Sequence, residues 1–210
     1  MKKLKVALLI IDADNDFVDP HGTLYVPKAD EAMKKLSKWL ENSGDIIDAV
    51  YASQDAHSIS HIGHPWFWKK LSDPKKPVTD VTYDDIVKRK VVPRFLPEDS
   101  AEYEEVIDYM LFLNETNKKY NIWPIHSIDG SWGQSFPTYL SEALNQWSLN
   151  NNFKTWTIIR KGQEELREMH SIFTYSFPLF REVGPAETLK YLEILQIYDK
   201  ILIAGQAKDY

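Results

Sequence analysis

The feature that most constrains the fold is a short apolar run near the start of the chain, Val6–Ile11, which ends abruptly at Asp12. A continuous apolar run of this length is typical of a strand that is covered on both faces, as in a parallel sheet between layers of helices. The following pattern predicts a helix over Ala29–Asn42 and a second strand over Ile46–Ser53. This β-α-β order indicates an α/β fold with three layers and a doubly wound, mainly parallel sheet.

The regular pattern breaks after the second predicted strand. Residues 65–121 combine prolines with charged clusters, and we expect a helix there over Asp99–Glu115, where Asp99 and Glu102 fit a capping box. We interpret 65–121 as an insertion in a single domain that spans 1–210. The α/β pattern resumes with two helices and two strands, expected at Pro137–Leu149, Thr155–Arg160, Ala186–Ile197 and Lys200–Ala204.

Composition excludes several classes of protein. The 210 residues carry a net charge of −6, which argues against a nucleic-acid partner recognised by bulk positive charge. No apolar run approaches the ~18 residues that span a bilayer, so we expect no membrane partner. The Val6–Ile11 run is also shorter than the core of a signal peptide, and the cytoplasm is the expected compartment.

The chain contains no cysteine. The 210 residues therefore hold no disulfide, no thiolate metal ligand and no cysteine nucleophile. The chain also ends six residues after its last predicted strand, where a doubly wound sheet would normally need a further helix to cover that strand. On these grounds we expect the domain to be incomplete at its C-terminus.

Polar side chains follow each predicted strand at the point where the strand ends. The carboxyl ends of parallel strands meet at one edge of the sheet, where ligands bind in open α/β folds. Four strand ends should therefore deliver carboxylates, imidazoles and a lysine to one rim, from residues 12–17, 54–64, 161–162 and 205–210. We take this convergence as the candidate functional site.

Asp55 and His57 indicate a metal site at this rim. They are two residues apart, so in an extended chain their side chains point to the same side and can reach one metal ion. His64 and His126 are further histidines of interest, whereas His61 taken alone is expected to be a solvated side chain. Aspartate and histidine without thiolate suit Zn²⁺, Fe²⁺ or Mn²⁺. The alternative is that these are loop histidines that bind no metal.

Four segments, in this order, resemble motifs of the isochorismatase-like cysteine hydrolases and of the nicotinamidases among them. They are the strand end with Asp12 and Phe17, the triplet Asp55-Ala56-His57, the segment Trp123-Pro124-Ile125-His126 and the strand end Ile158–Gly162 with Lys161. The resemblance extends from Val6 to Tyr210 and is weakest over 65–121. It implies the α/β fold of that family.

The resemblance also implies a role for each matched residue. Asp12 is the catalytic base, and Lys161 favours a thiolate by its charge. The backbone N–H of Ala207 helps to hold the developing oxyanion. Apart from the resemblance, four aromatic residues are candidates for the wall of a substrate pocket, with core packing as the alternative for each: Phe17 and Trp123, which we place in the pocket, and Trp66 and Trp68. One divalent metal ion, with zinc as the leading candidate and iron or manganese as alternatives, is held by Asp55, His57 and His126, with His64 as a candidate fourth ligand.

The implied reaction is the metal-dependent hydrolysis of a small-molecule carboxamide, in which nicotinamide and water give nicotinate and ammonia through a cysteine thioester. Three positions depart from the family. Asp14 stands where the family usually has glutamine, Ser127 stands where it usually has cysteine, and the nucleophilic cysteine would be the residue after Tyr210. The 210 residues by themselves are therefore not expected to form a thioester. The oligomeric state is left open, with a homo-oligomer as one outcome.

Two other interpretations remain open at this stage. A hydrophobic strand followed by Asp12-x-Asp14 also resembles the first motif of haloacid dehalogenase-like phosphatases, in which the first aspartate is the nucleophile, the second is the acid/base and Mg²⁺ is the cofactor. That interpretation accounts for Asp14 but leaves Asp55-x-His57 and His126 unexplained. The other alternative is a non-catalytic relative that keeps the fold and the metal site as a binding module.

Overall fold

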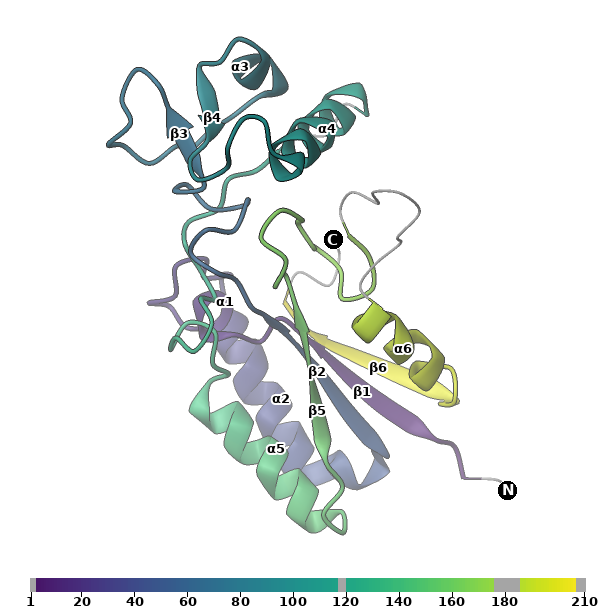
Figure 1. Ribbon diagram of the computed structural model, residues 1–210. Helices are drawn as coiled ribbons and strands as arrows, with labels where there is room; N and C mark the ends of the chain where they lie inside the picture. The colour runs from purple at the N-terminus through teal and green to yellow at the C-terminus, as the bar shows by residue number, and fades with distance from the viewer. Residues whose placement is uncertain (1–2, 117–119, 176–185, 207–210) are drawn as a thin grey trace.

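The computed structural model describes residues 3–116, 120–175 and 186–206. Figure 1 shows the elements in their order along the chain. They are β1 Val6–Ile11, α1 Asn15–Val18, α2 Ala29–Ser43, the 3₁₀ turn η1 Gly44–Ile46, β2 Ala49–Asp55, β3 Trp68–Lys70, α3 Tyr83–Val87, β4 Val91–Pro93, α4 Ala101–Glu115, α5 Thr138–Asn150, β5 Trp156–Lys161, α6 Ala186–Leu195 and β6 Lys200–Gly205. Among the helices in these ranges, none is both long and apolar enough to cross a membrane.

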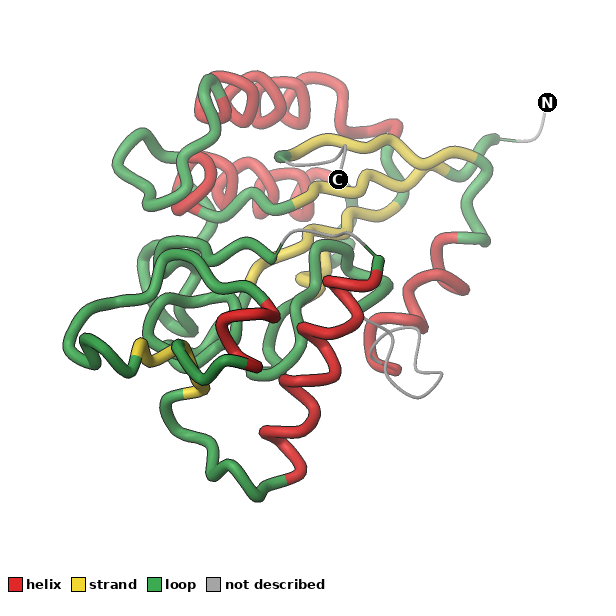
Figure 2. Tube along the Cα trace, turned by 90° about the horizontal axis from the view of Figure 1, so that it is seen from above, coloured by secondary structure: helices red, strands yellow, loops and turns green. Residues whose placement is uncertain are grey.

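A parallel sheet of four strands, in the order β5-β2-β1-β6, forms the centre of the fold. Helices α2 and α5 lie side by side along one face, and α6 lies on the other face (Figure 1 and Figure 2). The predicted α/β fold with three layers and a mainly parallel sheet is therefore confirmed. Because all four strands run in the same direction, their carboxyl ends lie at one edge of the sheet.

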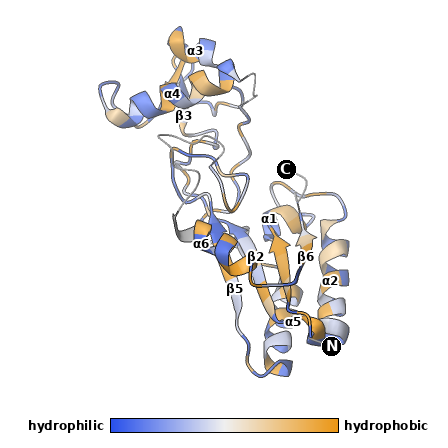
Figure 3. Cartoon of the chain, turned by 90° about the vertical axis from the view of Figure 1, so that its right-hand side faces the viewer, coloured by the Kyte–Doolittle hydropathy of each residue, from blue (hydrophilic) through white to orange (hydrophobic). Residues whose placement is uncertain are grey.

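Strand β1 is apolar on both faces because both faces are covered. Leu8 and Ile10 belong to the core beneath α2 and α5, in which Trp147 is only 1% exposed. Ala7 and Leu9 point to the opposite face and pack in the core on the side of α6. Figure 3 shows the apolar residues concentrated in the strands of the sheet. This double cover is the reason that the run Val6–Ile11 lacks an alternating polar residue.

The second strand and the cap of α4 differ from what the sequence predicted, and several other boundaries shift by one or two residues. The second strand, expected over Ile46–Ser53, spans Ala49–Asp55, because Ile46 belongs to the turn η1 that follows α2. The strand therefore runs two residues further at its carboxyl end and includes Asp55. The expected cap of α4 is also wrong, because Ser100 and not Asp99 is the residue whose side chain caps the first turn of that helix.

Residues 62–122 leave the sheet, with their helices and strands at the top of Figure 1, and form a second, smaller apolar core. The antiparallel pair β3 and β4 packs there with α3 and α4 around the fully buried Trp68. The Trp68 Nε1–H and the Tyr120 hydroxyl both donate to the carbonyl oxygen of Ile62, and the Trp123 N–H donates to that of Gly63 at 2.9 Å. These bonds bring the two ends of the insertion together beside the rim of the sheet.

Candidate active site

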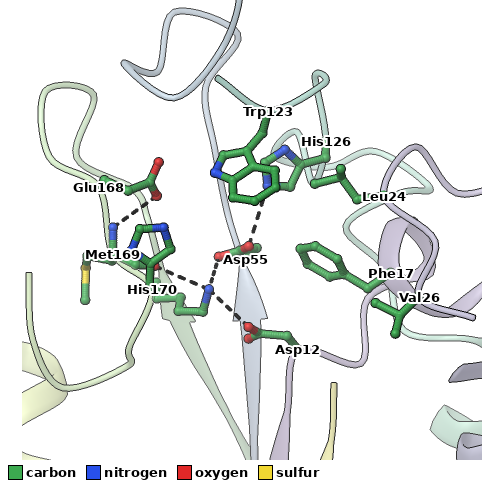
Figure 4. Close-up of a pocket in the computed structure, with 11 residues that line it drawn as sticks. Asp12, Phe17, Leu24, Val26, Asp55, Trp123, His126, Glu168, Met169 and His170 are labelled. Atoms are coloured by element: carbon green, nitrogen blue, oxygen red, sulfur yellow. Dashed lines mark hydrogen bonds and ion pairs between the residues drawn. The ribbon is translucent and has the colours of Figure 1, made fainter. Parts of the chain in front are cut away.

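Three strand ends place charged side chains next to one another. Asp12 follows β1, and Asp55 and Lys161 end the neighbouring strands β2 and β5, where they are register partners. Lys161 Nζ lies 2.5 Å from Asp55 Oδ1 and 3.2 Å from Asp12 Oδ2 (Figure 4). All three residues are buried. The rim therefore holds one ammonium group between two carboxylates.

The backbone of Asp12 turns sharply into the site. Its φ of 46° is a left-handed conformation that is uncommon for a residue with a side chain. Ser53 in β2 stabilises this turn, because its Oγ accepts the Asp12 N–H at 2.8 Å and donates to Asp12 Oδ1 at 2.6 Å. The other carboxylate oxygen of Asp12 is left to face Lys161.

Burial and charge oppose each other in this group. Burial raises the pKa of Asp12, and the Lys161 ammonium offsets only part of the rise. Burial would also raise the pKa of Asp55, but Lys161, His126 and His57 outweigh it and hold that pKa well below its usual range. Burial alone would lower the pKa of Lys161, yet the two carboxylates raise it, so the amine stays charged. Asp12 is therefore the carboxylate that accepts a proton more readily, as a general base must.

The second oxygen of Asp55 faces two histidines. Asp55 Oδ2 lies 3.6 Å from His57 Nε2 and 3.7 Å from His126 Nε2. Within the described part of the chain, these three residues offer ligand atoms that all lie within 4.8 Å of one another. Two ligand atoms about 2.1 Å from a tetrahedral metal ion are about 3.4 Å apart, so the spacing suits one ion.

Backbone carbonyl groups fix the orientation of both imidazoles. His57 Nδ1–H donates to Gly162 O at 2.8 Å, and His126 Nδ1–H donates to Pro124 O at 2.8 Å. Since a carbonyl oxygen only accepts, Nδ1 carries the proton in each ring, and in the neutral ring Nε2 keeps a lone pair on the side of Asp55. Metal-binding histidines typically have this arrangement. One carboxylate and two such imidazoles fit a divalent metal ion such as zinc.

His61 lies against this group without joining it. It is 1% exposed, so the expectation of a solvated side chain is wrong. Its Nδ1 accepts the Gly63 N–H at 3.1 Å, and its Nε2 lies 3.3 Å from Arg167 O. Both ring nitrogens thus have backbone partners, and burial lowers the pKa of His61 to about 4. Its ring packs on that of His57, with centroids 4.2 Å apart, and supports that side chain.

His64, the candidate fourth ligand, lies on the Nδ1 side of the His126 ring, whereas Asp55 lies on its Nε2 side. Its Nδ1–H donates to Ser58 O at 3.1 Å, and its Nε2 lies 3.4 Å from His126 Nδ1. That atom of His126 is the one bonded to Pro124 O, so His64 faces the back of the ring and not Nε2. Burial lowers the pKa of His64 to about 3. Its role as a fourth ligand stays a prediction.

A cavity of about 180 Å³ opens beside the charged groups. Its apolar lining consists of Phe17, Leu24, Val26, Trp123 and Met169, and its polar lining of Asp12, Asp55, His126, Lys161, Glu168 and His170. Figure 4 shows the segment 168–170 on one side of the cavity and Phe17, Leu24 and Val26 on the other. The structure thus places Phe17 and Trp123 in its wall, whereas Trp66 and Trp68 do not line it and Trp68 packs in the core of the insertion.

Sequence reasoning missed the segment that follows β5. Glu168, Met169 and His170 line the cavity, although the sequence around them has no periodicity that distinguishes a buried side chain from a solvated one. Glu168 is 7% exposed. Burial would raise its pKa, but His61, His57 and His170 outweigh burial and hold the pKa below its usual value. Ala207, expected to hold the oxyanion, lies outside the described residues.

Comparisons with known proteins agree with this architecture. No protein-family model matches the chain. A nicotinamidase of Saccharomyces cerevisiae is 25% identical over 203 residues, which are 97% of this chain and 76% of that protein. The structure of the yeast nicotinamidase bound to the inhibitor nicotinaldehyde matches with a TM-score of 0.57 and 21% identity, over 95% of this chain and 74% of that one. The chain is similar to nicotinamidases over nearly its whole length.

A second solved structure extends the comparison. A pyrazinamidase of Pyrococcus horikoshii in complex with zinc matches with a TM-score of 0.50 and 17% identity, over 98% of this chain and 73% of that one. The predicted resemblance to nicotinamidases is confirmed by the similarity to the yeast protein, and the fold that it implied is confirmed by the two solved structures. The comparisons do not favour the phosphatase-like alternative.

Proposed function

We propose that this protein hydrolyses nicotinamide, or a closely related aromatic carboxamide, to the carboxylate and ammonia. The observation that carries the proposal is a buried cluster of charged and imidazole side chains beside the cavity. In this cluster Lys161 forms ion pairs with both Asp12 and Asp55, and Asp55 faces two histidines. The aromatic side chains of the lining suit a flat ring. Nicotinamidases share the fold, and one of them is bound to nicotinaldehyde.

The metal in this proposal is a single zinc ion. Asp55 Oδ2, His57 Nε2 and His126 Nε2 would hold it, and His64 remains the candidate for a fourth ligand. A zinc ion held by three protein ligands supplies an open coordination position for a lone pair of the substrate. The zinc-bound pyrazinamidase of the same fold supports the choice of metal.

Asp12 and Lys161 are the groups that would handle protons and charge. Asp12 borders the cavity, and its raised pKa suits it to take a proton from the nucleophile and to pass it to the leaving ammonia. The Lys161 ammonium would stabilise an anionic nucleophile by its charge. The backbone N–H of Ala207 remains the proposed donor to the oxyanion.

The nucleophile in this proposal is a cysteine that follows Tyr210. The 210 residues contain no cysteine, so the proposal applies to a protein that carries this further residue. Ser127 does not take its place, because it is fully buried, its Oγ lies 3.5 Å from Asp14 Oδ2 and it is not among the residues that line the cavity. Sequencing the gene past Tyr210 tests this point, and a different residue there would favour the binding module.

The position of Asp14 argues against phosphatase chemistry. Asp14 is fully buried, and its Oδ2 accepts the Asp55 N–H at 2.8 Å. It does not line the cavity that Asp12 borders. An acid/base must reach the reacting group, so Asp14 is poorly placed for the role that the phosphatase interpretation gives it.

The surroundings of the reaction are also part of the proposal. The substrate is a small molecule, and we propose that the reaction takes place in the cytoplasm. In the described part of the chain, no helix is both long and apolar enough to cross a membrane. Size-exclusion chromatography with light scattering will decide between a monomer and a homo-oligomer.

Ammonia release from nicotinamide by the full-length protein tests the proposed function. Asp12→Asn keeps the shape of the side chain but removes the proton acceptor, so turnover should fall by about 10²–10⁴-fold. Asp19→Asn, at a side chain that is 37% exposed, is the control and should keep full activity. Unchanged turnover in Asp12→Asn would contradict the role of Asp12. No ammonia from any small aromatic amide would contradict the function itself.

A further inference from the structure

Two carboxylates that follow Asp12 have no part in the reaction described above. Asp14 and Asp16 are 0% and 6% exposed, and neither lines the cavity. We call Asp55, His57 and His126 the metal group, because they are the candidate metal ligands. Asp14 and Asp16 each accept a backbone N–H from a segment that carries this group. Asp14 Oδ2 accepts from Asp55 N at 2.8 Å, and Asp16 Oδ2 accepts from Ser127 N at 2.7 Å.

Ser127 connects the two histidines of the metal group. It follows His126 directly, and its carbonyl oxygen accepts the His57 N–H at 3.0 Å. Its φ of 45° is a left-handed turn that a serine adopts only when its surroundings impose it. The bond from Asp16 to the Ser127 amide is one such constraint. A change in this peptide would therefore move His126 and His57 together.

Asp16 is itself held in one position. Its N–H donates to Gly133 O at 2.9 Å, and its Oδ1 accepts the Thr23 N–H at 3.1 Å. A Cβ added to Gly133 would lie 2.1 Å from Asp16 Oδ2, and one added to Gly22 would lie 2.4 Å from the carbonyl oxygen of Asp16. The two glycines thus let the chain close around Asp16, and its carboxylate has little room to point elsewhere.

We infer that Asp14 and Asp16 are positioning residues of the metal centre, which act through the backbone of Asp55, His57 and His126. The inference rests on the proposed metal-dependent function and deepens it. Asp14 fixes the peptide of the carboxylate ligand, and Asp16 fixes the peptide between the two imidazole ligands. Partners that orient metal ligands typically change metal affinity by about 10–100-fold when they are removed.

The competing explanation is that both aspartates stabilise the loop after β1 and nothing more, a common use of aspartate in turns. The two explanations differ in what a substitution changes. A loop stabiliser lowers the melting temperature and leaves the zinc affinity of the folded protein unchanged. A positioning residue lowers the zinc affinity even at temperatures where the variant is fully folded.

Zinc titration of the metal-free, full-length protein against a competing chelator separates them. We expect Asp16→Ala and Asp14→Ala each to weaken Zn²⁺ binding by about 10–100-fold. Asp16→Asn should lose less than Asp16→Ala, because its one amide oxygen can still accept from Ser127 N. The matched control is Asp19→Ala, since Asp19 also accepts a backbone N–H, from His21 at 2.8 Å, in the same segment. Its zinc affinity should equal that of the wild type.

The visible absorption of bound Co²⁺ is the second readout, because it reports the geometry of the ligands. The spectra of Asp16→Ala and Asp14→Ala should differ from that of the wild type, whereas that of Asp19→Ala should not. If the alanine variants fail to fold, Asp16→Asn carries the test with the same two measurements. Wild-type affinity and spectrum in every folded variant would overturn this inference and leave the metal centre standing. A wild-type protein that binds no Zn²⁺ would overturn the metal centre itself.

Discussion

Asp12, Ser127 and Gly162, at the rim of the sheet, have left-handed backbone conformations. The angle φ is 46° at Asp12, 45° at Ser127 and 75° at Gly162. At each of them the chain turns so that a polar group meets the site: the Asp12 carboxylate meets Lys161, and the carbonyl groups of Ser127 and Gly162 bind His57. For a residue with a side chain this conformation costs about 1–3 kcal/mol, and it clusters at functional sites. These backbone conformations thus orient the polar groups of the site but lower the stability of the fold.

Gly162 is the position at this rim where any added side chain should be harmful. A Cβ there would lie 2.3 Å from His57 Cε1, so the bond from His57 Nδ1 to Gly162 O could not survive unchanged. We expect Gly162→Ala to weaken Zn²⁺ binding by about 10–100-fold in a chelator competition. Gly130→Ala is the control, because Gly130 has a φ of 76° and nothing within 4 Å of the added atom. Equal losses in both variants would attribute the effect to backbone strain and not to His57.

Some site residues could be predicted from a local sequence pattern, whereas the burial of others depends on distant parts of the chain. Asp55 and His57 could be paired because residues two apart in extended chain share a side. The burial of His61 could not be predicted, since it depends on the Arg167 carbonyl, which lies about a hundred residues further along the chain. The same holds for Glu168, which is buried by a fold of the segment after β5 that leaves no periodic pattern.

At the scale of elements, β1 was predictable to the residue and β2 was not. Strand β1 has apolar residues on both faces and a carboxylate at its end, which mark both boundaries. Before β2, the apolar pair Ile46-Ile47 continues the strand pattern, but Ile47 is buried in the core beneath α2 and α5 while Ile46 is half exposed. The reason lies in Asp48, whose Oδ2 accepts the Val6 N–H at 2.9 Å and so fixes where β2 can begin beside β1.

Asp48 should give the sheet a stability that depends on pH. The Val6 N–H holds the pKa of Asp48 below its usual value. A carboxylate whose pKa is depressed by folding stabilises the protein above its unfolded-state pKa of about 3.9, and this contribution is lost as the pH falls through the folded-state pKa. We therefore expect Asp48→Asn to lower the melting temperature at pH 7, and the difference from wild type to shrink below about pH 4.

The control for this prediction lies in the turn η1, shortly before Asp48 in the chain. Asp45 is exposed in η1, so Asp45→Asn should leave the melting temperature near that of the wild type at both pH values. A deficit of Asp48→Asn that stays constant from pH 7 to pH 3 would mean that the charge of Asp48 does not stabilise the fold.

At the scale of the whole molecule, the candidate metal ligands Asp55, His57 and His126 lie where the insertion joins the sheet. His57 precedes the insertion and His126 follows it, and the two segments are paired by a parallel bridge between His57 and Ile128. The loss of pattern predicted an insertion near 65–121. It did not predict that the insertion has its own apolar core, because strands of three residues such as β3 and β4 contain too few positions to show a period.

Metal removal should consequently loosen the insertion together with the sheet edge. An ion held by Asp55, His57 and His126 binds the folded chain only, so Zn²⁺ at 100 times its dissociation constant stabilises it by about 2.7 kcal/mol. For a domain of this size about 1 kcal/mol shifts the melting temperature by roughly 2–4 °C, so a chelator should lower it by about 5–11 °C and added Zn²⁺ should restore it. Calorimetry of the metal-free and zinc-loaded protein measures the shift. The double variant His57→Ala, His126→Ala should respond to neither addition, and a full zinc response in that variant would place the ion at another site.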